Sequence, residues 1–240
     1  MRLDAVRAVR GALLVGLALV IAKLFATGQM VFYMSPALDP LTALAAVLLG
    51  IMGILELRGA ARAAGDESMS VDQALTFALV LVPMLLGLMV APRALGSAAL
   101  GGESASELVI AFASGAGPRA DATPSAPIQD VSDLLAFLRR VGDGGVGQPV
   151  HAVGLVSRSA DLAPNEFVLL RYVIAHCVAD ARPVGLLVVG PGAAAWTTDQ
   201  WVEIDGSLAR RERDGAGLVT IVADRIGPTD EPTNPYLQAF

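Results

Sequence analysis

The stretch QALTFALVLVPMLLGLMVAP, residues Gln73–Pro92, contains no charged side chain. A helix needs about 20 mainly apolar residues to cross the roughly 30 Å hydrocarbon layer of a bilayer. The stretch therefore predicts a transmembrane helix, at about residues 71–91. Pro83 lies inside it, and membrane helices tolerate proline because neighbouring groups pair with the freed carbonyl. The proline can act as a static kink, which we favour, or as a hinge.

Two further apolar stretches precede this one, at about residues 6–26 and 40–57. The first has no charge from Gly11 to Ala22, and the second has none before Glu56. Lys23 fits near a helix end, where its long stem lets the ammonium group reach the headgroups. The sequence thus predicts a membrane domain of three transmembrane helices in residues 1–103.

Lys and Arg placement predicts how these helices are oriented, because cytoplasmic loops of membrane proteins are enriched in both. The loop Thr27–Asp39 has neither residue, whereas the next loop contains Arg58 and Arg62. Three arginines precede the first helix: Arg2, Arg7 and Arg10. We therefore expect a multi-pass cell-membrane protein with a cytoplasmic N-terminus and an extracytoplasmic C-terminal domain.

Charge is distributed unevenly along the 240 residues. Up to Glu103, seven Lys or Arg balance seven Asp or Glu, so the whole net charge of −6 lies in residues 104–240. An acidic domain is a poor partner for the phosphates of nucleic acid, so we expect no nucleic-acid binding. The single cysteine, Cys177, excludes a disulfide within the chain.

After the membrane domain, residues 104–127 are rich in Gly, Ala, Pro and Ser, which predicts a linker. Residues 128–240 then form the expected C-terminal domain. It begins with an amphipathic helix at Asp130–Arg140, whose apolar residues recur at helical spacing.

Five apolar runs, separated by turn residues, predict short strands in this domain. Five such strands, with Gly154 and Gly206 available for bends, fit a small closed or partly open barrel like the oligonucleotide/oligosaccharide-binding (OB) fold. The fold class expected is three transmembrane helices plus a mainly β, OB-like five-stranded domain. The strands expected are Val150–Arg158, Phe167–Ala175, Val184–Gly190, Trp201–Ala209 and Leu218–Ala223.

Catalytic motifs are absent from the sequence. It contains no phosphate-binding glycine loop before a helix, no nucleophile elbow and no HExxH motif. We therefore expect a protein that is not an enzyme. Three aromatic residues could form a stacking platform, although packing is the commoner role of such side chains: Tyr172, Trp196 and Trp201.

One polar cluster offers candidate metal ligands, namely His176, Cys177 and Asp180 in the sequence IAHCVADA. Imidazole, thiolate and carboxylate all bind divalent metals. Adjacent strand residues point to opposite faces, which works against convergence of His176 and Cys177. The alternative is a buried thiol beside a hydrogen-bonded histidine at a strand end. A second acidic group, Asp199, Glu203 and Asp205, is interpreted as a solvated face.

Four segments of the chain together resemble the YcgQ-like family of bacterial membrane proteins. They are TGQMVFYMSPALDPLTALAAVLLGI (27–51), FVLLRYVIAHCVADARPVGLLV (167–188), WVEIDGSL (201–208) and NPYL (234–237). The resemblance implies three N-terminal helices, a β-rich C-terminal domain and a larger multi-spanning permease partner. The family's cysteine pair is reduced to His176–Cys177 here, which excludes a dithiol mechanism. Gln29 and Ala37 replace basic residues of its pattern.

Three functions remain open from the sequence. The first is a non-catalytic accessory subunit of a two-component membrane permease, as the resemblance implies. The second is a membrane-anchored extracytoplasmic module that binds a metal or another ligand. The third is a structural subunit of a larger membrane complex, without haem or iron–sulfur ligands of its own.

Overall fold

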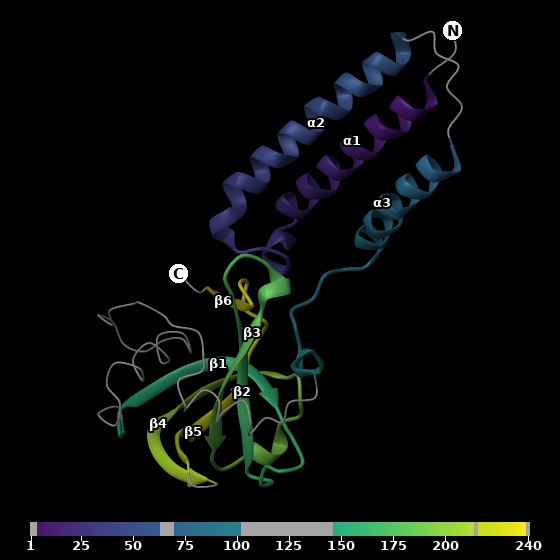
Figure 1. The fold of residues 1–240 in the computed structure, drawn as a ribbon. Helices are drawn as coiled ribbons and strands as arrows, with labels where there is room; N and C mark the ends of the chain where they lie inside the picture. The colour runs from purple at the N-terminus through teal and green to yellow at the C-terminus, as the bar shows by residue number, and fades with distance from the viewer. Residues whose placement is uncertain (1–3, 63–69, 102–145, 214–215, 239–240) are drawn as a thin grey trace. The chain divides into compact units, whose positions relative to one another are not determined.

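The computed structural model describes residues 4–62, 70–101, 146–213 and 216–238 (Figure 1). It divides the chain into two compact units, Met1–Arg93 and Ala94–Phe240. Leu95 and Leu100 pack against an apolar core of the second unit. The expected linker and the amphipathic helix at Asp130–Arg140 lie outside the described residues.

The first unit consists of three helices, α1 (Ala5–Ala26), α2 (Asp39–Arg62) and α3 (Val71–Met89). All three are long and apolar enough to cross a membrane, which confirms the expected helical segments. α2 extends beyond the predicted end at residue 57. Arg and Ala dominate the added turn, and both favour helix. α3 continues through Pro83.

Side-chain caps fix where two of these helices begin. The carboxylate of Asp4 accepts a hydrogen bond from the Arg7 amide at 3.1 Å and so satisfies one free N–H of the first turn of α1. At the start of α3, Ser70 and Gln73 form a reciprocal capping box. Polar residues therefore mark the ends of helices whose interiors are almost wholly apolar.

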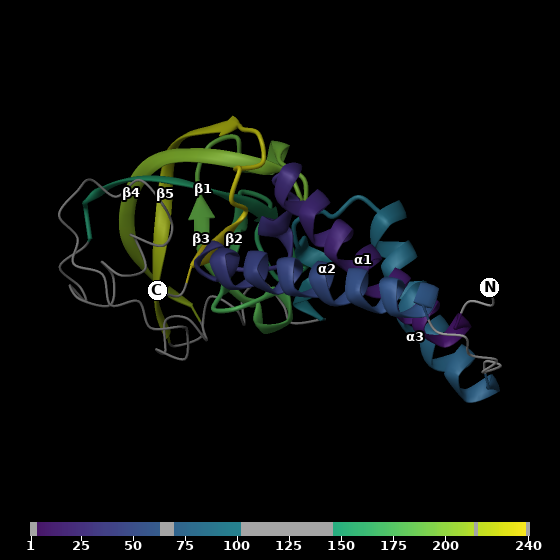
Figure 2. The ribbon, with the colours of Figure 1, turned by 90° about the horizontal axis from the view of Figure 1, so that it is seen from above.

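α1 and α2 run side by side in opposite directions (Figures 1 and 2). Arg10 near the start of α1 forms an ion pair with Glu56 near the end of α2, with 3.5 Å between Nη1 and Oε1. α3 packs more lightly against α1, where Gly16 faces Met84.

The second unit is a six-stranded mixed sheet in the order β1-β4-β5-β3-β2-β6. β1 also pairs with β2, so the first five strands form a closed ring of pairings. The pairs β3–β5 and β2–β6 are parallel, and the others are antiparallel. The strands are β1 (Pro149–Ser157), β2 (Glu166–Ile174), β3 (Arg182–Val189), β4 (Trp201–Arg213), β5 (Ala216–Pro228) and β6 (Tyr236–Gln238).

The five expected strands are confirmed, with two differences. β6 was not expected, because a three-residue strand carries too little pattern to be recognised. β4 and β5 are longer than the strands expected at 201–209 and 218–223, and they pair as far as Arg213 and Ala216. Ladder hydrogen bonds satisfy the backbone of both strands there, while Arg210, Arg211 and Glu212 keep exposed side chains. The paired ribbon curves strongly (Figure 2).

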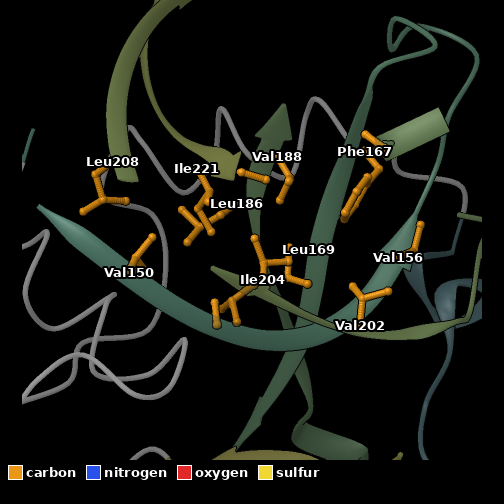
Figure 3. Close-up of a cluster of buried hydrophobic side chains, with 14 of the residues drawn as sticks. Val150, Val156, Phe167, Leu169, Leu186, Val188, Val202, Ile204, Leu208 and Ile221 are labelled. Carbon is orange, nitrogen blue, oxygen red and sulfur yellow. The ribbon is translucent and has the colours of Figure 1, made fainter. Parts of the chain in front are cut away.

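The main apolar core lies inside the ring (Figure 3). Phe167 and Leu169 of β2 contribute to it together with Ile204 of β4, and all three are fully buried. Every residue of β2 from Phe167 to Ile174 is buried, as expected for a central strand.

A second apolar core covers the other face of β2 and β3. Alternate residues of β2 supply it, among them Val168, Leu170 and Ile174. Leu95 and Leu100 pack against this core, as does the ring of Trp201. β2 and β3 are therefore covered by apolar side chains on both faces, which explains why β2 shows no alternation of apolar and polar residues in the sequence.

Candidate functional site

The candidate metal ligands lie in the turn that follows β2. β2 ends at Ile174, and a short 3-10 helix, Val178–Asp180, comes just before β3. His176 and Asp180 are brought together, with 3.2 Å between Nδ1 and Oδ2. Cys177 is partly exposed, and its sulfur accepts a hydrogen bond from the amide of Asp180.

The carboxylate of Asp180 serves the backbone of this turn. It accepts hydrogen bonds from the amides of Ala175 at 2.9 Å, His176 at 2.9 Å and Cys177 at 3.2 Å. These bonds, with that from Ala175 the largest contribution, lower the pKa of Asp180 below its ordinary value. An ionised carboxylate that receives three amides is a structural cap for the turn.

Metal binding by these residues remains a prediction. Across the described ranges, no group of three or more His, Cys, Asp or Glu side chains is arranged to hold a metal ion. The backbone amides already occupy both oxygens of Asp180. A metal would therefore compete with the hydrogen bonds that shape the turn.

His151, the second histidine, belongs to a charged network on β1, β4 and β5. Its Nδ1 lies 2.7 Å from Oδ1 of Asp205, and Arg225 donates to the other oxygen of Asp205 at 3.0 Å. Arg225 also donates to Glu203 at 2.8 Å. The hydrogen bond from His151, followed by that from Arg225, lowers the pKa of Asp205. This arrangement fits the expected solvated face, with the carboxylates paired across strands.

The aromatic platform is not formed. The side chain of Tyr172 is buried in the second core, and Trp196 packs against the main core instead. The guanidinium of Arg171 lies over the ring of Trp201, 5.4 Å from its centroid, which is cation–π geometry. These rings therefore serve packing rather than an open stacking surface.

Asp199 has a role that the sequence did not reveal. Its carboxylate accepts hydrogen bonds from the amide of Ser97 at 2.7 Å and from the Ser97 hydroxyl at 3.0 Å. Two tyrosines hold the adjoining residues: the hydroxyl of Tyr172 donates to the carbonyl of Gly96 at 2.8 Å, and the hydroxyl of Tyr236 accepts from the amide of Leu95 at 3.2 Å.

Both tyrosine hydroxyls are protonated at neutral pH. Burial, with smaller effects of Asp199 and Tyr236, raises the pKa of Tyr172 to about 12. Burial also raises the pKa of Tyr236. The hydrogen bond that Tyr172 donates to the Gly96 carbonyl is therefore present throughout the physiological range.

The membrane unit displays a large apolar surface. In the most apolar window of each candidate span, only 6%, 6% and 0% of residues are buried within the protein for α1, α2 and α3. Leu79 and Met89 of α3 are 78% and 84% exposed. Surface of this kind is compatible with lipid or with the helices of another membrane protein.

Comparison with known families accounts for both units. The model of the DUF1980 N-terminal domain matches residues 9–105, and that of the DUF1980 C-terminal domain matches residues 130–238. The chain belongs to the DUF1980 family. Its relatives and its three apolar helices make it a membrane protein.

Two relatives agree with the resemblance drawn from the sequence. One, from Streptococcus mutans, is provisionally named a subunit of a two-component membrane permease complex; it is 25% identical over 111 residues, which cover 45% of this chain and 40% of the relative. The other, UPF0703 protein YcgQ of Bacillus subtilis, is 31% identical over 64 residues, which cover 27% of this chain and 22% of the relative. The matches thus span less than half of each relative.

Among solved structures, a small single-stranded DNA-binding protein from Streptomyces coelicolor is similar to part of the chain. The match covers 35% of this chain and 93% of that protein, at 18% identity and a TM-score of 0.26. A likeness of this size carries no argument about what the DUF1980 protein binds.

Proposed function

We propose that this DUF1980 protein is a non-catalytic accessory subunit of a two-component membrane permease. The observation that carries the proposal is the large number of apolar side chains that α2 and α3 leave exposed, such as Leu41, Leu79 and Met89 at 65%, 78% and 84%. Three helices rarely enclose a transport path, and transporters commonly contain repeated bundles with central binding sites. The name of the Streptococcus mutans relative, a subunit of a two-component membrane permease complex, supports a second component.

The proposal includes an orientation, with the N-terminus in the cytoplasm and the β-domain outside it. The basic residues Arg7 and Arg10 at the start of α1 and Arg62 at the end of α2 support this arrangement. The antiparallel pairing of the two helices agrees with one part of it: Arg10 and Glu56 meet, so the start of α1 and the end of α2 lie on the same side of the membrane. α3 would then carry the chain across once more.

The β-domain of this subunit is proposed to be OB-like and to act by contact with protein rather than with nucleic acid. The closed ring of five strand pairings supports the fold. The net charge of −6 beyond Glu103 argues against nucleic-acid binding.

Isolation of the tagged full-length protein from its native membrane in mild detergent tests the proposal. Mass spectrometry should identify a multi-spanning permease in stoichiometric amount. A tagged, unrelated three-helix membrane protein controls for adventitious capture. Recovery of the protein without a multi-spanning partner contradicts the accessory role, and recovery with respiratory or other non-transport subunits favours the alternative of a structural subunit.

Cysteine labelling tests the orientation. In a Cys177→Ser background, a cysteine at the exposed position Asp230 should react with an impermeant maleimide on intact cells. A cysteine at Ala61, near the end of α2, should react only after the cells are permeabilised. The reverse pattern would overturn the proposed orientation without affecting the proposed partner.

A further inference from the structure

The segment that follows α3 is fastened to the β-domain at three consecutive residues. Leu95 is held by Tyr236 of β6, Gly96 by Tyr172 of β2 and Ser97 by Asp199 in the loop before β4. The partners come from three separate parts of the domain. We call these contacts the clasp.

Packing shows that the clasp is a fitted arrangement. Leu95 and Leu100 pack against the second apolar core on either side of the polar contacts. A Cβ at Gly96 would lie 2.9 Å from Oδ1 of Asp199, so a larger residue at this position would force the Asp199 carboxylate to shift.

The backbone conformation of Asp199 is a second indication that the clasp is a specific arrangement. Its φ is +67°, in the left-handed region that non-glycine residues adopt at a cost. This conformation persists because the side chain binds Ser97 twice and the amide donates to the carbonyl of Val156 at 2.9 Å. Contacts on both sides of the residue therefore hold it in place.

The clasp shortens the covalent path between the two units. α3 ends at Met89, and Leu95 is only six residues further on. At 3.3–3.6 Å per residue, six residues reach about 20 Å at most. From Met89 to the start of β1 at Pro149, by contrast, the chain runs through 60 residues. Its fully extended length is roughly 200 Å.

We propose that the clasp, made by Leu95, Gly96 and Ser97 with Tyr172, Asp199 and Tyr236, couples the β-domain mechanically to the end of α3. Movement of α3 then reaches the β-domain through the five residues 90–94. A long flexible linker would not transmit such a movement. The accessory subunit thereby has a route by which a change in the membrane reaches its β-domain. The coupling itself requires no partner protein, so its test is independent of the proposed permease.

The first test measures hydrogen exchange in the full-length protein in lipid nanodiscs. The amides of Leu95 and Ser97 are donors in the clasp and should be protected in the wild type. Asp199→Gly removes both bonds to Ser97 while accepting the positive φ without strain. Loss of these bonds should accelerate exchange of the peptide containing Ser97 about tenfold. Wild-type exchange at the rate of an unstructured peptide would overturn the proposal.

Matched variants separate the clasp from general damage to the domain. Thr198→Val removes a hydrogen bond from the Arg158 amide in the same loop, and should leave exchange at Ser97 unchanged. Tyr236→Phe and Ser97→Ala each remove one hydroxyl of the clasp and preserve most of the packing. If Asp199→Gly does not fold, the same hydrogen-exchange measurement is made on these two variants.

The second test measures coupling directly by electron–electron resonance. Spin labels are placed at Met89 and at the exposed Asp224 of β5 in a Cys177→Ser background. The distance distribution should be broader in Tyr236→Phe combined with Asp199→Gly than in the wild type. Distributions of equal width in the wild type and in the folded variant would overturn coupling through the clasp.

Discussion

Gly11 of α1 and Gly53 of α2 face each other across the helix pair: a Cβ added to either glycine would lie 2.9 Å from the carbonyl oxygen of the other. Contact at this distance is possible only between backbones without side chains. In a membrane, helices associate largely through such close packing, because lipid tails supply no hydrophobic drive. The two glycines therefore set how closely α1 and α2 approach.

Replacing Gly53 by Leu should separate the pair. The Cβ alone would approach Cγ2 of Val15 to 2.8 Å, and overpacking of this kind costs about 1–3 kcal/mol. The loss can be measured by titrating the full-length protein in mixed micelles with sodium dodecyl sulfate and following helicity. Gly87→Ala is the control, because nothing lies within 4 Å of its added Cβ. Equal stability of G53L and G87A would contradict close packing at Gly53.

Arg171 should be needed to hold the C-terminal strand. Its buried guanidinium donates to the carbonyls of Val153, Asn234 and Pro235. Arg171→Met would leave three carbonyls without this donor, at a cost of about 3 kcal/mol in the free energy of unfolding.

Chemical denaturation of the full chain measures this effect, together with hydrogen exchange in β6. Arg171→Lys should recover only part of the stability that Arg171→Met loses. Its compact ammonium group cannot donate to three separated carbonyls as the planar guanidinium does. Arg182→Met, at an exposed position of β3, should change stability by less than about 0.5 kcal/mol. A near-neutral R171M would show that the C-terminal strand does not depend on this side chain.

The sequence predicts elements with long or strongly periodic patterns and misses those that depend on distant partners. The apolar runs located the helices, and the turn residues located β1 to β5. β6 has three residues and is defined by parallel pairing with Tyr172, Val173 and Ile174 of β2. Nothing local distinguishes such a strand from a loop.

The candidate sites show the same limit. His176 and Asp180 are only four residues apart, so the sequence could predict that their side chains lie close together. The use of Asp180 as a backbone cap depends on how the chain turns after β2, which spacing alone does not give. The clasp joins residues separated by 76, 102 and 141 positions, so no local pattern could reveal it.

Gly206 should be essential to the bend of β4. The register of β4 and β5 shifts between Asp205 and Gly206, and a Cβ at Gly206 would collide with the carbonyl oxygen of Val222. Gly206→Ala should cost about 1–3 kcal/mol of unfolding free energy in chemical denaturation. Gly227→Ala, in the paired strand, places its Cβ at an ordinary 3.4 Å from Glu203 and should be neutral or slightly stabilising. Equal effects of the two substitutions would contradict the bulge.

Asp180 should make the turn after β2 sensitive to acid. Hydrogen bonds from the backbone, that from Ala175 foremost, lower the pKa of Asp180 in the folded state below the ordinary value of 3.8. A group with a lowered folded pKa stabilises the fold fully above its unfolded pKa, and this stabilisation is lost as the pH falls through the folded value. Asp180→Asn should therefore melt below the wild type at pH 6, and the two should converge as the pH falls below about 4. Asp224→Asn, at an exposed position of β5, controls for the removal of a surface charge. If the difference between the wild type and D180N stays constant from pH 6 to pH 3, the ionised carboxylate is not what holds the turn.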